Sequence, residues 1–199
     1  MPSAHIRWIN RAALLLLAIT LLALVLIASG LFDPAPLGSQ LWARELPQMS
    51  VPSNTREIQW IGEEVPQSPA TIRLTAARQS GEQDIGYGLV VGDETAYLAV
   101  AVSPLGYLAV WETANQDVTT DDSYLLEWQT WPHVHTDSED NEIWLDIDGN
   151  RANLRINREW LWEGEIRGGT NHIGLLGESF GDTAAVDFET VELFSGASE

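Results

Sequence analysis

The sequence contains no cysteine and no lysine, and each absence excludes several kinds of site. Without thiolates the chain has no disulfide framework, no cysteine-ligated zinc or iron–sulfur cluster, and no cysteine nucleophile. Its only basic residues are ten arginines, against 29 acidic residues among 199, and the net charge is −19. Nucleic acid is therefore excluded as a partner, because neutralising phosphates needs clustered Lys and Arg.

One long uncharged run lies near the N-terminus. Residues Ala12 to Phe32 carry no charge, and Thr20 and Ser29 are their only polar side chains. A helix of this length spans about 30 Å, which is the thickness of the hydrocarbon core of a bilayer. The sequence therefore predicts one transmembrane helix, which contacts the lipid bilayer through residues 12–32.

Charges on either side of this run predict its orientation. Arg7 and Arg11 precede it, whereas Asp33 follows it and no basic residue occurs before Arg44. The positive-inside rule then gives a short cytoplasmic tail (residues 1–11) and an extracytoplasmic remainder, in a single-pass protein of the cell membrane. A cleaved signal peptide is the alternative, with small residues at Ala28–Gly30. A retained anchor is favoured because the apolar run exceeds the usual h-region of about 7–15 residues.

The chain beyond Phe32 has a different composition. It holds all 29 acids and eight of the ten arginines, a balance that repels anionic lipid headgroups. Residues 33–53 include four prolines, which disfavour helix and sheet, so they are expected to form an extended linker. Residues 54–199 are expected to form the folded domain.

This domain shows a hydrophobic period of two, typical of strands. Short β-branched or aromatic runs alternate with turn residues, and no helical segment follows Leu46. The pattern predicts an all-β fold, a two-sheet antiparallel jelly-roll sandwich. The ten expected strands are 71–77, 86–91, 96–102, 106–113, 124–129, 142–148, 152–156, 160–165, 172–176 and 185–194.

One hairpin can be predicted residue by residue. A two-residue turn at Gly149–Asn150 pairs Asp148 with Arg151 and, further along, Trp144 with Arg155. Alternation then places the apolar residues on one face, which must be core, and Trp144, Asn153 and Arg155 on the other. We expect Arg155 to stack on an exposed Trp144 there. The core residues of this hairpin are Ile143, Leu145, Ile147, Ala152, Leu154 and Ile156.

Several of these segments resemble a known family. The stretches Tyr87–Val91, Tyr97–Trp111, Asn141–Asn157, Ile173–Leu176 and Val186–Phe194 resemble the strands of the concanavalin A-like lectin/glucanase sandwich. More closely, they resemble the laminin-G-like modules of bacterial exported proteins, over about residues 71–194. The pattern departs from the family at Ile156–Arg158, where the usual tight turn has a glycine. These motifs are structural, so the resemblance implies a fold and leaves the activity open.

Glucanases of that superfamily use two carboxylates on one strand, and the nearest candidates here are two acidic sets. One comprises Glu142, Asp146 and Asp148, and the other comprises Asp187, Glu189 and Glu192. Neither has the expected Glu-x-Asp-x-Glu order, so we expect no catalysis. A diverged glycoside hydrolase remains an alternative.

Metal motifs are incomplete. Asp146-x-Asp148-x-Asn150 begins like a calcium loop but has Arg151 in place of the required glycine. His133 and His135, which Asp137 follows, lack a third ligand in place unless the distant His172 supplies it, so a zinc site is not indicated. No cofactor or metal is therefore expected, although calcium at the acidic segment 137–140 stays open.

Tryptophans provide the remaining signal. Six of the nine lie between Trp111 and Trp162, and most are expected in the core. Sugars stack on exposed rings flanked by polar groups, which makes Trp144 and Arg155 the first candidate contacts, with Trp131 and Asn153 next. The sequence thus favours a non-catalytic binding module for a glycan or an envelope protein. A structural accessory subunit of a membrane complex is the second reading.

Overall fold

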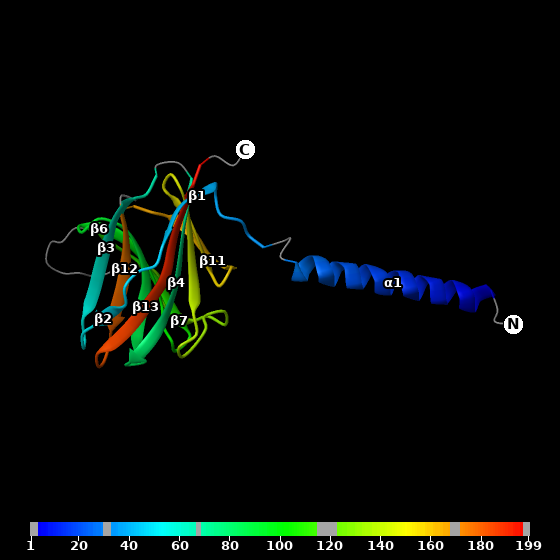
Figure 1. Cartoon of the computed structure of the whole chain (residues 1–199), viewed down its shortest axis with the longest axis horizontal. Coiled ribbons are helices and arrows are strands. Elements are labelled where there is room, and N and C mark those ends of the chain that lie inside the picture. Colours follow the sequence, from blue (N-terminus) through cyan, green and yellow to red (C-terminus); the bar gives the residue numbers. More distant parts are fainter. Residues whose placement is uncertain (1–3, 30–32, 67–68, 115–122, 168–171, 197–199) are drawn as a thin grey trace. The chain divides into compact units, whose positions relative to one another are not determined.

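A computed structural model describes residues 4–29, 33–66, 69–114, 123–167 and 172–196. The chain divides into two units, Met1–Ala35 and Pro36–Glu199. The first contains a single helix and the second contains all the strands (Figure 1).

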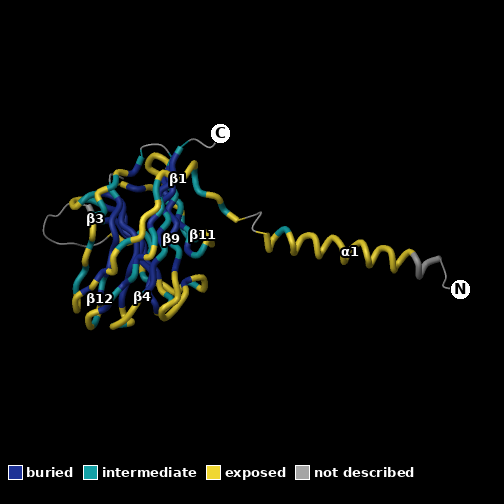
Figure 2. Tube along the Cα trace, in the orientation of Figure 1, coloured by how far each residue is buried: buried dark blue, intermediate teal, exposed yellow. Residues whose placement is uncertain are grey.

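Helix α1 spans Ala4–Ala28 and begins eight residues before the predicted start. Its segment Trp8–Ala28 is long and apolar enough to cross a membrane, by length and composition. The Leu and Ile residues of this segment are exposed except Leu26, which is half-buried, and Figure 2 colours most of the helix as exposed. The hydroxyl of Thr20 donates to the Leu16 carbonyl over 3.0 Å, so this polar group is satisfied within the helix. The predicted end at Phe32 lies outside the described residues.

The second unit is a sandwich of two antiparallel sheets, as predicted. Sheet A has seven strands in the order β1-β13-β4-β9-β10-β11, with β2 also on β13. Sheet B has six, in the order β3-β12-β5-β6-β7-β8. The strand bounds are β1 Ser39–Arg44, β2 Met49–Val51, β3 Arg56–Glu64, β4 Ala70–Gly81, β5 Ile85–Gly92, β6 Ala96–Val102, β7 Tyr107–Ala114, β8 Ser123–Thr130, β9 Asn141–Asp148, β10 Arg151–Ile156, β11 Glu159–Glu165, β12 His172–Ser179 and β13 Ala184–Ser195.

The core lies between the sheets, and its buried residues are dark blue along the strands in Figure 2. From sheet A, Ile143, Leu145 and Leu154 are at most 1% exposed, which confirms the predicted core side of the hairpin. Leu89 and Val100 of sheet B are equally buried opposite them. Each such side chain contributes roughly 1.5–3 kcal/mol of burial free energy.

The register of the β9–β10 hairpin is confirmed. Its pairs run from Asp148 with Arg151 to Ile143 with Ile156. The next turn joins β10 to β11 and lacks the glycine of the family pattern. There Asn157 and Arg158 take φ values of 51° and 72°, so two non-glycine residues adopt the left-handed conformation of a tight hairpin turn.

The linker prediction for residues 33–53 is wrong over much of its length. Ser39–Arg44 and Met49–Val51 are strands, and both pair with β13. The prolines did not prevent this pairing because Pro47 and Pro52 fall just outside the strands. Arg56–Glu64 is a further strand, β3, which was absent from the ten expected runs.

A buried polar group joins the two sheets within the core. The Asn141 side chain of β9 donates to the Tyr87 hydroxyl of β5 over 3.0 Å. It also accepts the His135 N–H over 2.8 Å and donates to the His135 carbonyl, so the loop before β9 is held to the same amide. Burial, more than the nearby Asp140 charge, raises the pKa of Tyr87 to about 12.

This pKa predicts a specific alkaline destabilisation. Below pH 10 both folded and unfolded states keep the Tyr87 proton, and above it the unfolded state loses the proton first. The free energy of unfolding should therefore fall between pH 10 and about 12, by at most about 3 kcal/mol from this group. Urea unfolding of the native protein and of Tyr87→Phe across this range measures the difference. Parallel pH curves for the two proteins would contradict the assignment.

Candidate functional site

Trp144, the first candidate contact, does not lie where the sequence placed it. Its side chain is 1% exposed, so the prediction of an exposed ring is wrong. The ring does face outward from sheet A, but the Arg73 guanidinium of β4 lies 5.6 Å from its centroid and also 5.3 Å from Phe194 of β13. Its Nε1 donates to Asp146 over 2.7 Å. Side chains from strands distant in sequence therefore cover it.

The other three candidates, Trp131, Asn153 and Arg155, are half-buried. Arg155 stands opposite Trp144 in the register, as predicted, but the cation that stacks on the indole is Arg73. Asn153 lies two residues along the same strand. Trp131 packs partly against the core, and its ring centroid lies 5.8 Å from that of His133. The structure does not gather the four into one pocket among the described residues.

The two candidate carboxylate sets meet at Arg73. This guanidinium lies 2.6 Å from Glu192 and 3.9 Å from Glu142, and Glu142 also lies 3.7 Å from Arg158. Asp146 accepts hydrogen bonds from Thr71 and Trp144. These acids thus belong to an ion-pair network on the outer side of sheet A.

The histidines do not converge. His135 Nδ1 lies 2.7 Å from the Asp140 carbonyl, whereas His172 stands in sheet B. No group of three or more acidic or histidine side chains in the described part of the chain is arranged to hold a metal ion.

The outward side of sheet B carries an unexpected apolar surface, which we call the aromatic face. Outward sides of antiparallel sheets are usually polar. Here a second hydrophobic cluster covers the side opposite the core, and its central residues are at most 8% exposed. The members are Val90, Tyr97, Ala99, Ala101, Ala109, Trp111 and Leu176, with Ile58, Trp60 and Trp128 packed on them.

Glycines in the floor of this face make room for its largest rings. A Cβ at Gly86 would lie 2.8 Å from the Trp128 ring, and one at Gly174 would lie 3.0 Å from the Trp60 ring. Both indoles therefore lie close against the backbone of neighbouring strands. The ring of Trp60 makes an edge contact with that of Tyr97, with their centroids 6.4 Å apart. The ring centroids of Trp128 and Trp111 are also 6.4 Å apart.

A charged pair crosses the middle of the aromatic face. The Arg56 guanidinium lies 4.9 Å from the Trp111 ring centroid and donates to both Glu178 oxygens, at 2.9 and 3.1 Å. The side chains of Arg56 and Glu178 are only 24% and 14% exposed. Trp111 Nε1 beneath them is buried and has no hydrogen-bond partner among the described residues.

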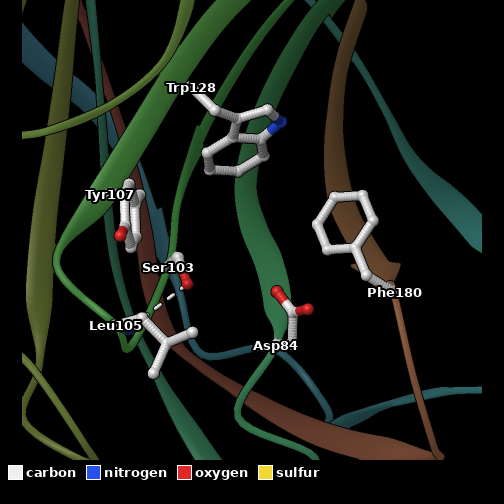
Figure 3. Close-up of a pocket in the computed structure, with 6 residues that line it drawn as sticks. All are labelled: Asp84, Ser103, Leu105, Tyr107, Trp128 and Phe180. Carbon is white, nitrogen blue, oxygen red and sulfur yellow. Dashed lines mark hydrogen bonds between the residues drawn. The ribbon is translucent and has the colours of Figure 1, made fainter.

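Two pockets open at opposite ends of the aromatic face. The first, the Trp128 pocket, has a volume of about 300 Å³ and is ringed by the side chains in Figure 3. The second, the Trp60 pocket, has a volume of about 500 Å³. The lining residues are Asp84, Ser103, Leu105, Tyr107, Trp128 and Phe180 in the first, and Trp60, Gly62, Asp93, Glu94, Thr95 and His172 in the second.

Sequence reasoning missed this face, although the chain carries a signal for it. In β5 and β6 the positions between core residues are small, namely Gly86 and Gly88 in one strand and Ala99 and Ala101 in the next. An outward side made of small residues leaves room for large rings from other strands of the sheet, here Trp60 of β3 and Trp128 of β8. The alternation of apolar and polar residues within a single strand cannot show which rings fill the space above these small residues.

Comparisons with known proteins are informative only at the level of structure. No protein-family model matches the chain, and no curated protein sequence is similar to it. Its structure is similar to the carbohydrate binding module CBM66 from Bacillus subtilis, with 11% identity and a TM-score of 0.58, over 80% of this chain and 99% of that one. A β-fructofuranosidase from Aspergillus kawachii matches over 79% of this chain but 28% of its own, with 10% identity and a TM-score of 0.54.

A fructosyltransferase from A. japonicus is similar to about the same extent, with 12% identity and a TM-score of 0.54, over 79% of this chain and 26% of that one. At these identities the likeness establishes the fold alone, a jelly-roll sandwich of two antiparallel sheets. The chain corresponds to about a quarter of the length of each of the two enzymes.

The Arg56–Glu178 pair predicts a measurable coupling. Because both groups are largely shielded from water, a double-mutant cycle of Arg56→Met and Glu178→Gln should give a coupling of about 1–3 kcal/mol in urea unfolding. The exposed pair Arg151–Glu163, at 3.7 Å, is the matched control and should give about 0.5 kcal/mol or less. Equal couplings in the two cycles would refute the shielding argument.

Proposed function

We propose that the sandwich is a non-catalytic glycan-binding module, held at the outer side of the cell membrane by its N-terminal helix. The observation that carries this proposal is the aromatic face. Exposed or half-exposed rings such as Trp60, Tyr124 and Phe180 offer flat apolar surfaces on which sugar rings stack. Pockets with apolar walls and a few polar groups at both ends supply places for hydroxyls to bond.

Similarity to the carbohydrate binding module from B. subtilis supports the same class of ligand, since that module is matched over nearly its whole length. Sugar-acting enzymes appear among the similar structures, but only about a quarter of each is matched. Within the concanavalin A-like sandwiches, the laminin-G-like group is the finer assignment that we propose from the sequence motifs.

Binding without catalysis is proposed because three of the six candidate carboxylates are engaged elsewhere. Glu142 and Glu192 lie against Arg73, and Asp146 accepts two hydrogen bonds. A diverged glycoside hydrolase would need an acid and a second carboxylate facing a sugar-sized cleft.

A structural accessory subunit is the second candidate function. It is favoured by Trp160, which is 53% exposed on the edge strand β11 beside a pocket of about 420 Å³. An exposed ring on a sheet edge is a common contact in protein interfaces.

Membrane attachment through residues 12–32 is the third part of the proposal. The helix is apolar over the length that a bilayer requires, and Arg7 and Arg11 precede it, which favours a cytoplasmic N-terminus.

The first test is a glycan array probed with the full-length protein in a polyoxyethylene detergent, which carries neither sugar nor charge. We expect at least one glycan class to bind. Trp60→Ala and Tyr124→Ala should each weaken that binding about tenfold, because a ring–sugar stack contributes about 1–1.5 kcal/mol. Circular dichroism confirms that each variant is folded.

Trp160→Ala is the matched control, because it removes a more exposed indole from the other sheet. Arg155→Ala, Asn153→Ala and Trp131→Ala test the site that the sequence suggested. A loss of binding in these variants, with Trp60→Ala unaffected, would move the site to sheet A. An array without any bound glycan would contradict the proposed function.

The membrane proposal predicts that the native protein resists carbonate extraction from membranes. Placing an arginine at Leu17, near the middle of the apolar helix segment Trp8–Ala28, should shift it toward the soluble fraction, since a charge at mid-bilayer costs about 2.5–3.5 kcal/mol. Ala13→Arg, near the end of the same segment, is the control and should remain in the membrane. A mature protein whose N-terminus starts near Ser29 would instead show a cleaved signal peptide.

A further inference from the structure

The Trp128 pocket combines aromatic walls with a carboxylate. Three rings line it, from Trp128, Tyr107 and Phe180, and the last two are 40% and 44% exposed. Figure 3 shows these side chains around an opening, with the Asp84 carboxylate pointing into it between Leu105 and Phe180.

The pocket has a negative charge with no basic counterpart in its lining. Of the described residues that line it, Asp84 alone is charged, and the other hydrogen-bonding groups are the hydroxyls of Ser103 and Tyr107 and the indole N–H of Trp128. The Ser103 oxygen accepts the Leu105 N–H over 3.2 Å. The nearby Arg56 guanidinium lies over Trp111, the ring next to Trp128, and its charge is paired with Glu178 at 2.9 and 3.1 Å.

A second carboxylate, that of Glu82, lies two residues before Asp84, and the Arg78 charge acts on it. Glu82 accepts the backbone N–H groups of Gln83 and Asp84 at 2.8 and 3.1 Å, and that of Asp182 at 3.3 Å. These bonds, that of Asp84 foremost, hold the pKa of Glu82 below its usual value, so the group stays ionised. Glu82 also ties the turn before β5 to the turn after β12, which fixes Asp84 and Phe180 on either side of the pocket.

Aromatic rings and a carboxylate around one cavity suit an organic cation as the ligand. The faces of aromatic rings attract cations, and organic ammonium groups are commonly held by several rings with an acid nearby. A neutral sugar would leave the Asp84 charge uncompensated, and an anionic sugar would be repelled by it.

We infer that the Trp128 pocket binds the ammonium group of a deacetylated amino sugar, carried by the glycan that the aromatic face receives. This inference rests on the proposed function for the nature of the carrier. A glycan is favoured over a lipid headgroup because Trp128 belongs both to the pocket and to the aromatic face, so a chain bound along the face reaches the pocket directly.

The test compares pairs of ligands that differ only in charge. Glucosamine and galactosamine tetramers, and their fully N-acetylated counterparts, are titrated by calorimetry into the full-length protein in polyoxyethylene detergent. We expect at least one deacetylated tetramer to bind about tenfold or more tightly than its acetylated partner, and added salt to reduce the difference.

Two variants locate the effect. Asp84→Asn keeps the size of the side chain and removes its charge, so it should abolish the preference while leaving the affinity for the acetylated tetramer within about twofold. Phe180→Leu keeps an apolar wall without a ring and should reduce the preference severalfold. Asp148→Asn removes an exposed charge from the β9–β10 turn in the other sheet, and it should leave the preference unchanged.

Equal affinities within each pair, or a preference that survives Asp84→Asn, would overturn the inference. So would binding of phosphocholine, used as the headgroup probe, without binding of any amino-sugar tetramer. Both results are compatible with other glycans binding on the array, so they are distinct from failure of the proposed function, in which no glycan binds.

Discussion

The absence of side chains at two floor positions of sheet B determines the shape of the whole outer surface of that sheet. Gly86 and Gly174 leave space that the indoles of Trp128 and Trp60 fill, and a Cβ at either position would collide with the ring. The rings in turn shield Trp111 and the Arg56–Glu178 pair from water. A surface that would ordinarily be polar thus becomes a second apolar layer, with a pocket at each end. The proposed glycan-binding surface and the proposed ammonium pocket both belong to this layer.

Sequence patterns predicted most of the sandwich because the strands obey local rules. The register of the β9–β10 hairpin was predicted correctly because a slip of one residue would bury Asp146 and Arg155 and expose Leu145. The first two strands were missed for a different reason. Prolines around Ser39–Arg44 and Met49–Val51 suggested an extended linker, and only pairing with β13, more than 100 residues later, makes these segments strands.

The candidate site was less predictable, since it depends on contacts between distant strands. Alternation correctly put Trp144 on the outer side of sheet A, but exposure depends on what lies above the ring. Arg73 and Phe194 supply that cover from β4 and β13, at separations in sequence that no local pattern reveals. Conversely, Phe180 and Asp84 lie in turns that looked like simple connections. They become neighbours because Glu82 ties the two turns together.

The N-terminal segment enters the sandwich through β1, which hydrogen-bonds along β13 from Ser39 opposite Ser195 to Arg44 opposite Val191. Tension applied to that segment would therefore pass into the backbone of sheet A. Trp60 and Trp128 belong to sheet B, across the core from β1. A force that separates β1 from β13 would therefore leave these two rings in place.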